Sequence, residues 1–183
     1  MNRISISPQQ LILPAIKIWA HRWPLLTAGD FTSGNFNAMT VGWGGLGVMW
    51  NKPIAMVVVR PSRYTYEFME EHDTFTLSVL PESHRQALTI CGETSGRDVD
   101  KIKLAGLTPV PSLVVDAPGF DEAELIIECR KMYTAPFESH RFLDPQIIKH
   151  YPDGDLHLMT FGEVVAIRGT SDYVASASAA EVQ

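Results

Sequence analysis

The chain has 183 residues, of which 45% are hydrophobic and 20% are charged. This composition is typical of one globular domain with a substantial core, and it excludes a disordered chain. The formal net charge of −6 argues against a nucleic acid as the main partner, because a polyanion requires a basic surface.

Six segments have the composition and pattern of β-strands. The first precedes a turn that begins at Gly29, and the second follows a turn at Gly34 and Asn35. The third contains no polar side chain and is therefore expected to be buried on both faces. The predicted strands are residues 23–28, 37–41, 54–59, 74–80, 123–132 and 156–167.

Three short helices are predicted between these strands, from their capping residues and apolar spacing. They are residues 65–72 with Thr65 as N-cap, residues 81–92 ending at Gly92, and residues 98–105 with Asp98 as N-cap and Gly106 just beyond.

The excess of strands decides the predicted fold class. Strands that do not alternate regularly with helices favour a closed or nearly closed antiparallel barrel. Because neither an internal repeat nor a linker is visible, residues 1–183 are predicted to form a single domain. Its core is expected at about residues 20–168, and residues 171–183 are expected to form a flexible tail.

The two cysteines, Cys91 and Cys129, lie far apart in the sequence. A domain of this size does not require a disulfide, and no secretory signal is visible. No uninterrupted apolar run approaches the roughly 20 residues of a membrane-spanning helix. The sequence therefore predicts a cytoplasmic protein with reduced cysteines and without a membrane segment.

One motif points to a function that its context excludes. Residues 42–47, Gly-Trp-Gly-Gly-Leu-Gly, match the G-x-G-x-x-G pattern of dinucleotide-binding proteins. In those proteins the last glycine opens a helix whose N-terminus faces a pyrophosphate. Here Pro53 and a β-branched segment follow, so we interpret residues 42–47 as a glycine-rich loop between strands.

Residue types that bind anions follow the third predicted strand. Arg60, Ser62, Arg63, Tyr64 and Thr65 lie between this strand and a predicted helix start. Arginines supply forked donors, hydroxyls supply short hydrogen bonds, and a helix N-terminus carries about half a positive charge. A single arginine at a strand end is more often a solvated surface charge, but two arginines with a capping threonine favour a phosphate monoester site.

A second cluster has the residue types that a flavin ring requires. The ring is a flat, mostly apolar plate with a polar edge, so it needs aromatic or methionine contacts together with amide and hydroxyl groups. Asn37, Met39, Thr40 and Trp43 supply both. Methionine and tryptophan also fit the interior corner of a barrel, and the sequence alone leaves both interpretations open.

Two further groups are candidates for the flavin edge. Ser95, Gly96 and Lys101 lie at a turn and a predicted helix start, from which Lys101 could place a positive charge near the ring. On spacing alone, a capped surface helix with solvated charges is the stronger interpretation. His157 lies in a predicted strand, where a lone histidine is more often structural than catalytic. No spacing of histidines and cysteines predicts a metal site.

Taken together and in this order, these clusters resemble the flavin reductase-like, FMN-binding split-barrel family, which includes flavoredoxin. The resemblance covers about residues 20–168. Its individual pieces are short, but their ordered set is specific. The matching stretches are residues 25–30, 37–43, 50–53, 59–65, 75–78, 95–101, 125–129 and 162–163, together with His157.

The resemblance implies a mainly β fold: a six-stranded Greek-key split barrel with a few added helices. It also implies a homodimer with FMN at the subunit interface. His157 would stand on the nicotinamide side in members that use NAD(P)H, and Lys101 would place its charge at the flavin. The residues assigned to FMN are Arg60, Ser62, Arg63, Tyr64 and Thr65 at the phosphate, Asn37, Met39, Thr40 and Trp43 along the ring, and Ser95, Gly96 and Lys101 at the ring or ribityl edge.

The implied activity is that of a flavin reductase-like oxidoreductase. Hydride would pass from NAD(P)H to the bound flavin, and electrons would then pass to a small-molecule or protein acceptor. One alternative is a non-enzymatic electron carrier of the flavoredoxin type, with tightly bound FMN. A second keeps the barrel but binds haem, a deazaflavin or a pyridoxal-type phosphate, and a third is a dimeric scaffold with an empty groove.

Overall fold

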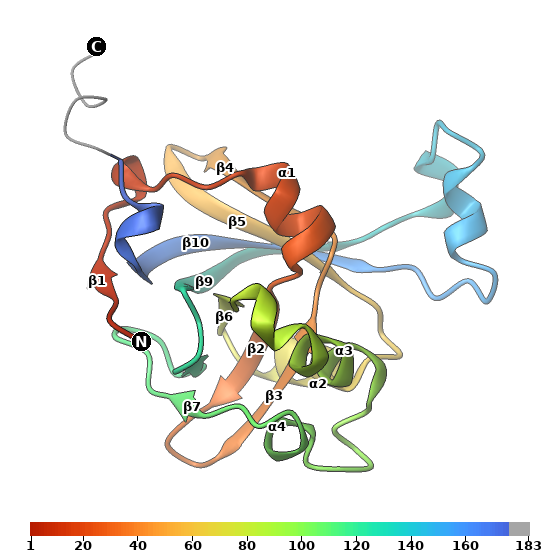
Figure 1. The fold of residues 1–183 in the computed structure, drawn as a ribbon. Helices are drawn as coiled ribbons and strands as arrows, with labels where there is room; N and C mark the ends of the chain where they lie inside the picture. Colours follow the sequence, from red (N-terminus) through yellow and green to blue (C-terminus); the bar gives the residue numbers. More distant parts are fainter. Residues whose placement is uncertain (176–183) are drawn as a thin grey trace.

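The computed structural model describes residues 1–175, and strands make up most of its regular structure (Figure 1). Two strands of 12 residues, Leu125–Pro136 (β9) and Leu158–Gly169 (β10), pair along their length. The other strands are Ile4–Ser5 (β1), Leu25–Asp30 (β2), Asn35–Thr40 (β3), Gly44–Met49 (β4), Lys52–Val59 (β5), Thr74–Val79 (β6), Pro109–Val110 (β7) and Gly119–Phe120 (β8).

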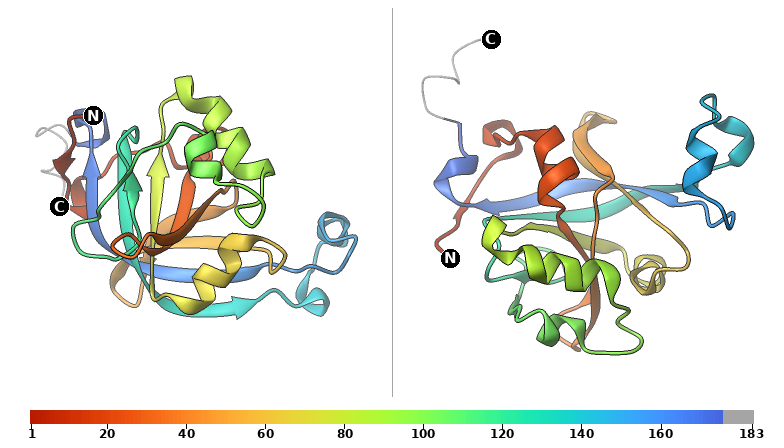
Figure 2. Two further views of the ribbon diagram at one scale, coloured as in Figure 1. Left: turned by 90° about the horizontal axis from the view of Figure 1, so that it is seen from below. Right: turned by 45° about the vertical axis from the view of Figure 1, so that its right-hand side comes forward.

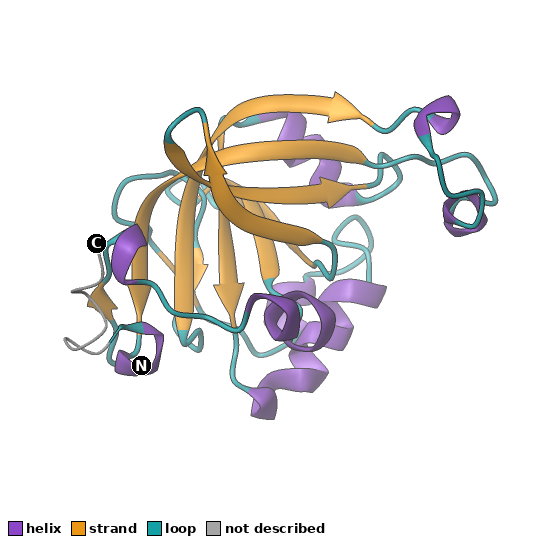
Figure 3. Cartoon of the chain, turned by 90° about the horizontal axis from the view of Figure 1, so that it is seen from above, coloured by secondary structure: helices purple, strands orange, loops and turns teal. Residues whose placement is uncertain are grey.

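Eight strands form one antiparallel sheet that curls into an incomplete barrel (Figure 3). The order is β3-β2-β6-β9-β10-β5-β4, and β1 pairs with β10. β3 and β4 are the edges of this order, and within residues 1–175 no ladder of hydrogen bonds joins them, so the barrel is split there. The predicted mainly β, split-barrel fold is confirmed. The six predicted strands are present as β2, β3, β5, β6, β9 and β10.

The glycine-rich segment forms strand β4, where the sequence predicts a loop. β4 pairs with β5, and a two-residue turn at Trp50 and Asn51 joins the two strands. Both turn residues have a positive φ, as a type I′ turn requires. Gly44 is needed for packing, because a Cβ there would lie 2.5 Å from the ring of Trp19. A strand rather than a helix follows the glycines, in agreement with the exclusion of a dinucleotide-binding motif.

The first two predicted helices exist with shifted ends. Helix α2 (Tyr64–Glu71) begins after Arg63, so Thr65 lies inside the helix and is not its N-cap. Helix α3 (Arg85–Glu93) continues through Gly92, which the sequence predicts as its end. Neither helix has a side-chain hydrogen bond at its N-cap, and both are held by packing against the sheet.

The third predicted helix is shorter than expected. Helix α4 (Lys101–Leu104) has Asp100 as its N-cap, and this carboxylate accepts a hydrogen bond from the backbone N–H of Lys103 at 3.1 Å. Asp98 is therefore not the cap. No helix in residues 1–175 is both long and apolar enough to cross a membrane. The remaining short helices and helical turns are Pro8–Gln10, Ala15–Lys17 (α1), Ile18–Arg22, Glu82–His84, Ser139–Arg141, Ile147–His150 and Ser171–Tyr173.

The core has two parts, because the sheet is buried on both faces. Leu26 and Ala28 of β2 pack inside the barrel with Phe75 of β6. Leu25, the alternate residue of β2, belongs to a second cluster with Leu88 of α3. Helices α3 and α4 thus lie outside the barrel, whereas α2 contributes Phe68 and Met69 to the cluster inside it. In Figure 2, α2 accordingly lies apart from α3 and α4. This packing brings the starts and ends of the helices to the split.

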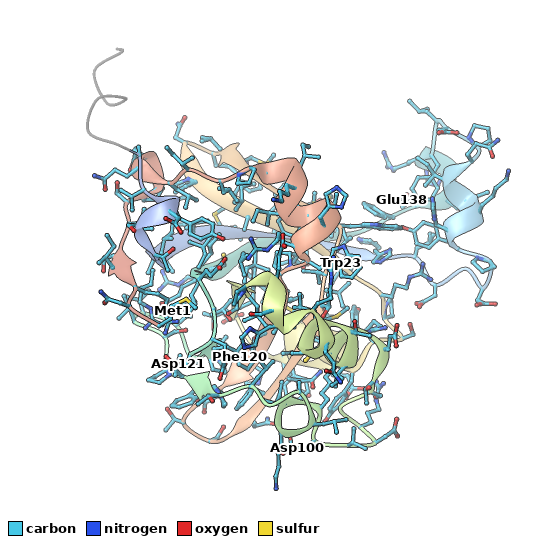
Figure 4. All side chains as sticks on the ribbon, in the orientation of Figure 1. Met1, Trp23, Asp100, Phe120, Asp121 and Glu138 are labelled. Atoms are coloured by element: carbon cyan, nitrogen blue, oxygen red, sulfur yellow. The ribbon has the colours of Figure 1, made fainter. Side chains whose placement is uncertain are left out.

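The N-terminal segment, which the family resemblance does not cover, packs against the barrel. β1 pairs with β10, and Trp19 is buried in the barrel core. Met1 lies beside Asp121, whose carboxylate is 3.6 Å from the terminal amine (Figure 4). The segment therefore belongs to the same folded unit as the strands.

The predicted flexible tail begins with a docked segment. Tyr173 is buried, and its hydroxyl donates a hydrogen bond to Glu124 at 3.1 Å. The backbone N–H of Ala175 donates to the carbonyl of Gln10 at 2.8 Å. Residues 171–175 are therefore part of the fold, and residues 176–183 lie outside the described residues.

One segment, which we call the arm, is residues 137–156, which follow β9 and precede His157 and β10. It projects to one side of the barrel in every view (Figures 1 and 2). Its outer part carries Leu143, which is 97% exposed. The arm makes hydrogen bonds to the residues after β5, including one from the Arg60 guanidinium to the carbonyl of His150 at 2.7 Å. It therefore borders the split end of the barrel.

Candidate functional site

Two neighbouring hollows lie where the barrel is split. The first, which we call the cationic hollow, has a volume of about 270 Å³ and lies between the start of α2 and the end of α3. Its lining residues are Ser62, Arg63, Tyr64, Thr65, Glu93, Thr94, Ser95 and Lys101. The second, the aromatic groove, has a volume of about 200 Å³, and its lining residues are Met39, Thr40, Val41, Gly42, Trp43, Val58, Arg60 and His157.

Arg63 is placed in the cationic hollow by the turn between β5 and α2. Its side chain is half-buried and donates a hydrogen bond to the carbonyl of Gly92, near the end of α3. Burial, and to a lesser extent the charge of Arg60, lowers the pKa of Arg63. The guanidinium stays protonated, since an arginine pKa lies far above neutrality, so the hollow contains a partly desolvated positive charge.

Lys101 lies at the first turn of α4 and is only 3% exposed, although a lysine is almost never buried without a partner. Its ammonium donates to the carbonyls of Cys91 at 3.3 Å and Thr94 at 3.2 Å. Burial, followed by the charge of Arg63, lowers the pKa of Lys101 to about 8, while Cys91 raises it. The ammonium has three donors, and these two bonds leave one for a ligand.

Among the residues that the structure describes, the positive charges of the two hollows have no carboxylate partner. Within residues 1–175, no acidic oxygen lies within 4.0 Å of the charged nitrogens of Arg60, Arg63 or Lys101. Glu93 lines the same hollow but forms no ion pair with these cations. A desolvated cation without a counter-ion is costly, so the hollow favours a ligand with negative charge.

A buried hydrogen bond joins β3 to the cationic hollow. The side-chain amide of Asn37 donates to the hydroxyl of Thr65 at 2.7 Å, and both residues are buried. Gly96 packs directly on this pair, because a Cβ there would lie 2.4 Å from the amide oxygen of Asn37. Thr65 therefore serves as an anchor between strand and helix rather than as a helix cap.

The aromatic groove contains Arg60, which the sequence assigns to the phosphate together with Arg63. The Arg60 guanidinium lies over the ring of Tyr151 at 5.1 Å from the ring centre. The structure therefore places the two arginines in different hollows. The assignment of Arg63 to an anion is the better supported of the two.

His157 is surrounded by aromatic rings. Its ring centre lies 5.0 Å from that of Trp43 and 5.5 Å from that of Tyr151. Burial, followed by the charge of Arg60, lowers the pKa of His157 to about 4, whereas Asp155 raises it. His157 is therefore neutral at pH 7, and it can exchange hydrogen bonds without adding charge to the groove.

The structure brings together almost every residue that the sequence predicts for the site. Ser62, Arg63, Tyr64, Thr65, Ser95 and Lys101 line one hollow, and Met39, Thr40, Trp43, Arg60 and His157 line the other. Two of these hydroxyls already donate hydrogen bonds to protein acceptors: Ser62 donates to the arm residue Asp155, and Thr40 donates to the carbonyl of Leu88 at 2.6 Å.

Sequence analysis missed the contribution of the arm. His150, Tyr151 and Asp155 contact Arg60, His157 and Ser62, and the first and last of these pairs span 90 or more positions. No local sequence pattern predicts contacts between residues so far apart in the chain. The sole signal is the clustering of aromatic residues around His157, which by itself is equally typical of a hydrophobic core.

A comparison with protein families identifies the fold's relatives. The sequence model described as "Flavin reductase like domain" matches residues 19–177. The chain belongs to the flavin reductase-like family. This match includes both hollows and most of the described residues, and it extends the resemblance seen in the sequence through the docked residues 171–175.

Two solved structures of proteins with related names have a fold similar to that of this chain. The structure has a TM-score of 0.66 with an FMN-binding domain of a flavin reductases-like enzyme from Shewanella baltica OS155, at 19% identity, covering 92% of this chain and 77% of that one. It has a TM-score of 0.65 with flavoredoxin from Methanosarcina acetivorans, at 26% identity, covering 95% and 78%.

A curated relative is an uncharacterized protein of Pyrococcus abyssi (strain GE5 / Orsay). It is 28% identical over 94 residues, which is 51% of this chain and 54% of that protein. The chain thus matches about half the length of this relative. The family and the split-barrel fold are established by these comparisons.

Proposed function

We propose that this flavin reductase-like protein binds FMN and acts as an NAD(P)H-dependent oxidoreductase. The phosphate of FMN would occupy the cationic hollow, and the ring would lie along the aromatic groove. When bound, FMN supplies the redox chemistry, since it takes hydride from a reduced nicotinamide and passes electrons to a second acceptor. The protein supplies binding, orientation and charge.

One observation carries this proposal: the buried ammonium of Lys101 and the half-buried guanidinium of Arg63 face the same hollow, and no acidic group within residues 1–175 pairs with either. A phosphate monoester carries nearly two negative charges at pH 7 and accepts several hydrogen bonds. It therefore fits the donors and the charge that the hollow presents. The hollow is smaller than the roughly 300–1,000 Å³ of most ligand sites, so a whole FMN molecule requires the groove as well.

The aromatic groove suits the ring. Met39 and Trp43 offer apolar and polarizable contacts, and Trp43 is 46% exposed, so part of its surface is free for a ligand. Val58 continues the apolar lining. Arg60 and His157 supply hydrogen-bond donors beside these contacts. The groove thus offers the combination of a flat apolar surface and a polar edge that a flavin ring requires.

The first test is whether the purified protein binds FMN and whether NADH or NADPH reduces it. We expect a yellow protein, or a colourless one that quenches the fluorescence of added FMN. Under anaerobic conditions we expect the flavin absorbance to bleach when either nucleotide is added. A protein that fails to bind FMN at high micromolar concentration would contradict the proposal, and the same titration with haem, a deazaflavin or pyridoxal phosphate would then identify another ligand.

The likeness to flavoredoxin favours one alternative, a non-enzymatic electron carrier with tightly bound FMN. The same anaerobic experiment separates the two functions. Bound FMN that resists NADH and NADPH but is bleached by dithionite would support the carrier. Bleaching by a nucleotide at a rate that exceeds its reaction with free FMN would support the reductase.

We further propose that two copies of the chain pair, with FMN between them. The aromatic groove is open at Trp43, and a second copy would cover the exposed side of the ring. Light scattering on the size-separated protein, with and without FMN, is expected to give twice the mass of the 183-residue chain. A monomer that retains FMN would show that the groove on a single chain is sufficient.

A further inference from the structure

Tyr151 of the arm makes a buried hydrogen bond to His157. The phenol oxygen lies 2.9 Å from Nδ1 of the imidazole, and the two residues are 4% and 9% exposed. His157 lines the aromatic groove, whereas Tyr151 is not among the residues that line it. The bond therefore connects the arm to a group that a ligand would touch.

The direction of this hydrogen bond follows from the other partners of the phenol. Tyr151 has one hydroxyl proton. Burial raises the pKa of the Tyr151 phenol, while the charge of Arg60 lowers it. Within residues 1–175 the hydroxyl has no acceptor other than Nδ1. If Nδ1 carried a proton and donated it to Tyr151, the hydroxyl proton would remain without an acceptor in a buried place, which is unfavourable because a buried donor then stays unsatisfied. The hydroxyl therefore donates, and Nδ1 accepts.

This direction determines the second nitrogen of the ring. A neutral imidazole has one N–H, so an accepting Nδ1 places the proton on Nε2. Nε2 makes no hydrogen bond within residues 1–175. A fully buried nitrogen without a partner would be one of the buried unsatisfied atoms of the structure, and Nε2 is not one of them. It is thus accessible, and because His157 lines the aromatic groove, the groove is where a ligand reaches it.

Arg60 holds this arrangement in place. Its guanidinium donates to the carbonyl of His150 at 2.7 Å and lies over the ring of Tyr151. These two contacts fix the arm next to the end of β5. The burial of the ring and the positive charge of Arg60 also hold the pKa of His157 at about 4, against the opposing effect of Asp155. The imidazole consequently remains neutral over the physiological pH range.

We propose that Tyr151 is a positioning residue that fixes His157 with its proton on Nε2, so that His157 donates a hydrogen bond to a carbonyl oxygen of the substrate in the aromatic groove. This inference rests on the proposed function for the identity of the substrate. The carbonyl has two sources: the carboxamide of the reduced nicotinamide, or a carbonyl group of the oxidising acceptor, such as a quinone.

The tautomer can be read by nitrogen-15 NMR on the protein without flavin, so this result does not depend on FMN binding. A His157→Gln variant assigns the signals. We expect the proton on Nε2 in the wild type, and a mixture of both tautomers in Tyr151→Phe, which lacks the hydroxyl. A wild-type ring that carries its proton on Nδ1 would overturn the proposal, and so would a Tyr151→Phe variant with an unchanged tautomer.

The substrate is identified by measuring the two half-reactions separately. Tyr151→Phe is expected to weaken the affinity for one substrate by about 3- to 10-fold, the effect of one neutral hydrogen bond, and to leave the absorbance of bound FMN unchanged. An effect on reduction by NADH or NADPH identifies the carboxamide, and an effect on reoxidation by a quinone identifies the acceptor. Tyr133→Phe, which removes the hydroxyl of a half-exposed tyrosine outside the lining of the groove, is the control. Unchanged half-reactions in Tyr151→Phe would overturn the substrate contact even where the wild type binds and reduces FMN as proposed.

Discussion

Replacing Arg63 with alanine is expected to weaken FMN binding by about 2–5 kcal/mol, which corresponds to roughly 30- to 5,000-fold in the dissociation constant. Arg63 is half-buried in the cationic hollow and has no acidic partner within residues 1–175. Without it, a phosphate would enter a partly desolvated hollow with Lys101 as its principal counter-charge. Fluorescence quenching of FMN measures the change.

Riboflavin is the decisive control, because it has the same ring but no phosphate. Arg63→Ala is expected to leave riboflavin binding within about 1 kcal/mol of the wild type, since the lost interaction is with the phosphate. Arg60→Ala, which removes a charge from the aromatic groove instead, should affect both ligands alike. Because Arg63 also bonds the carbonyl of Gly92, thermal unfolding must show that the variant is folded. Equal losses of FMN and riboflavin in folded Arg63→Ala would place the phosphate elsewhere.

Sequence patterns predicted the six main strands, because apolar alternation is a local signal that burial in the sheet preserves. β4 could not be predicted in the same way. Its glycines weaken the strand signal, and its turn uses Trp50 and Asn51 rather than the usual Asn-Gly pair. A glycine is required at position 44 because the ring of Trp19, which is distant in the sequence, occupies the space that a side chain at this position would need. Long-range packing of this kind leaves no local pattern.

The candidate site was predictable in composition but not in arrangement. The residue types around Arg60 and Arg63 indicated an anion site, yet a turn separates the two side chains into different hollows. Threonine is a residue type that often caps a helix, but the Thr65 hydroxyl instead accepts a hydrogen bond from the side-chain amide of Asn37 on β3. For Lys101, spacing favoured a solvated surface charge, whereas the packing of α4 against α3 buries it. Each difference results from contacts between elements that are distant in the sequence.

Lys101→Met is expected to have opposite effects on the unliganded fold and on FMN binding. The pKa of Lys101 is lowered to about 8 in the folded protein, chiefly by burial, so folding disfavours the charged ammonium. Methionine has a similar volume and no charge. At pH 7 the free energy of unfolding should therefore rise by about 1–3 kcal/mol, while FMN binding should weaken by about 2 kcal/mol or more, because a phosphate loses a charged donor.

The pH dependence gives the sign of each effect. Below pH 8 the folded wild type bears the full cost of the buried charge. Between pH 8 and the ordinary lysine pKa of 10.5 the folded state binds fewer protons than the unfolded state, so wild-type stability rises toward that of Lys101→Met. FMN favours the charged ammonium, so wild-type affinity is expected to be constant from about pH 6.5 to 7.5 and to fall as the pH rises through about 8.

Denaturant unfolding and FMN titration at matched pH values test both signs. Lys103→Met, on the same helix but exposed, is the control and should change neither quantity appreciably. In Lys101→Met the fall of FMN affinity above pH 8 should disappear. If this variant instead bound FMN as tightly as the wild type and showed the same pH profile, the buried ammonium would have no contact with the phosphate, and Arg63 would have to hold it with neutral donors alone.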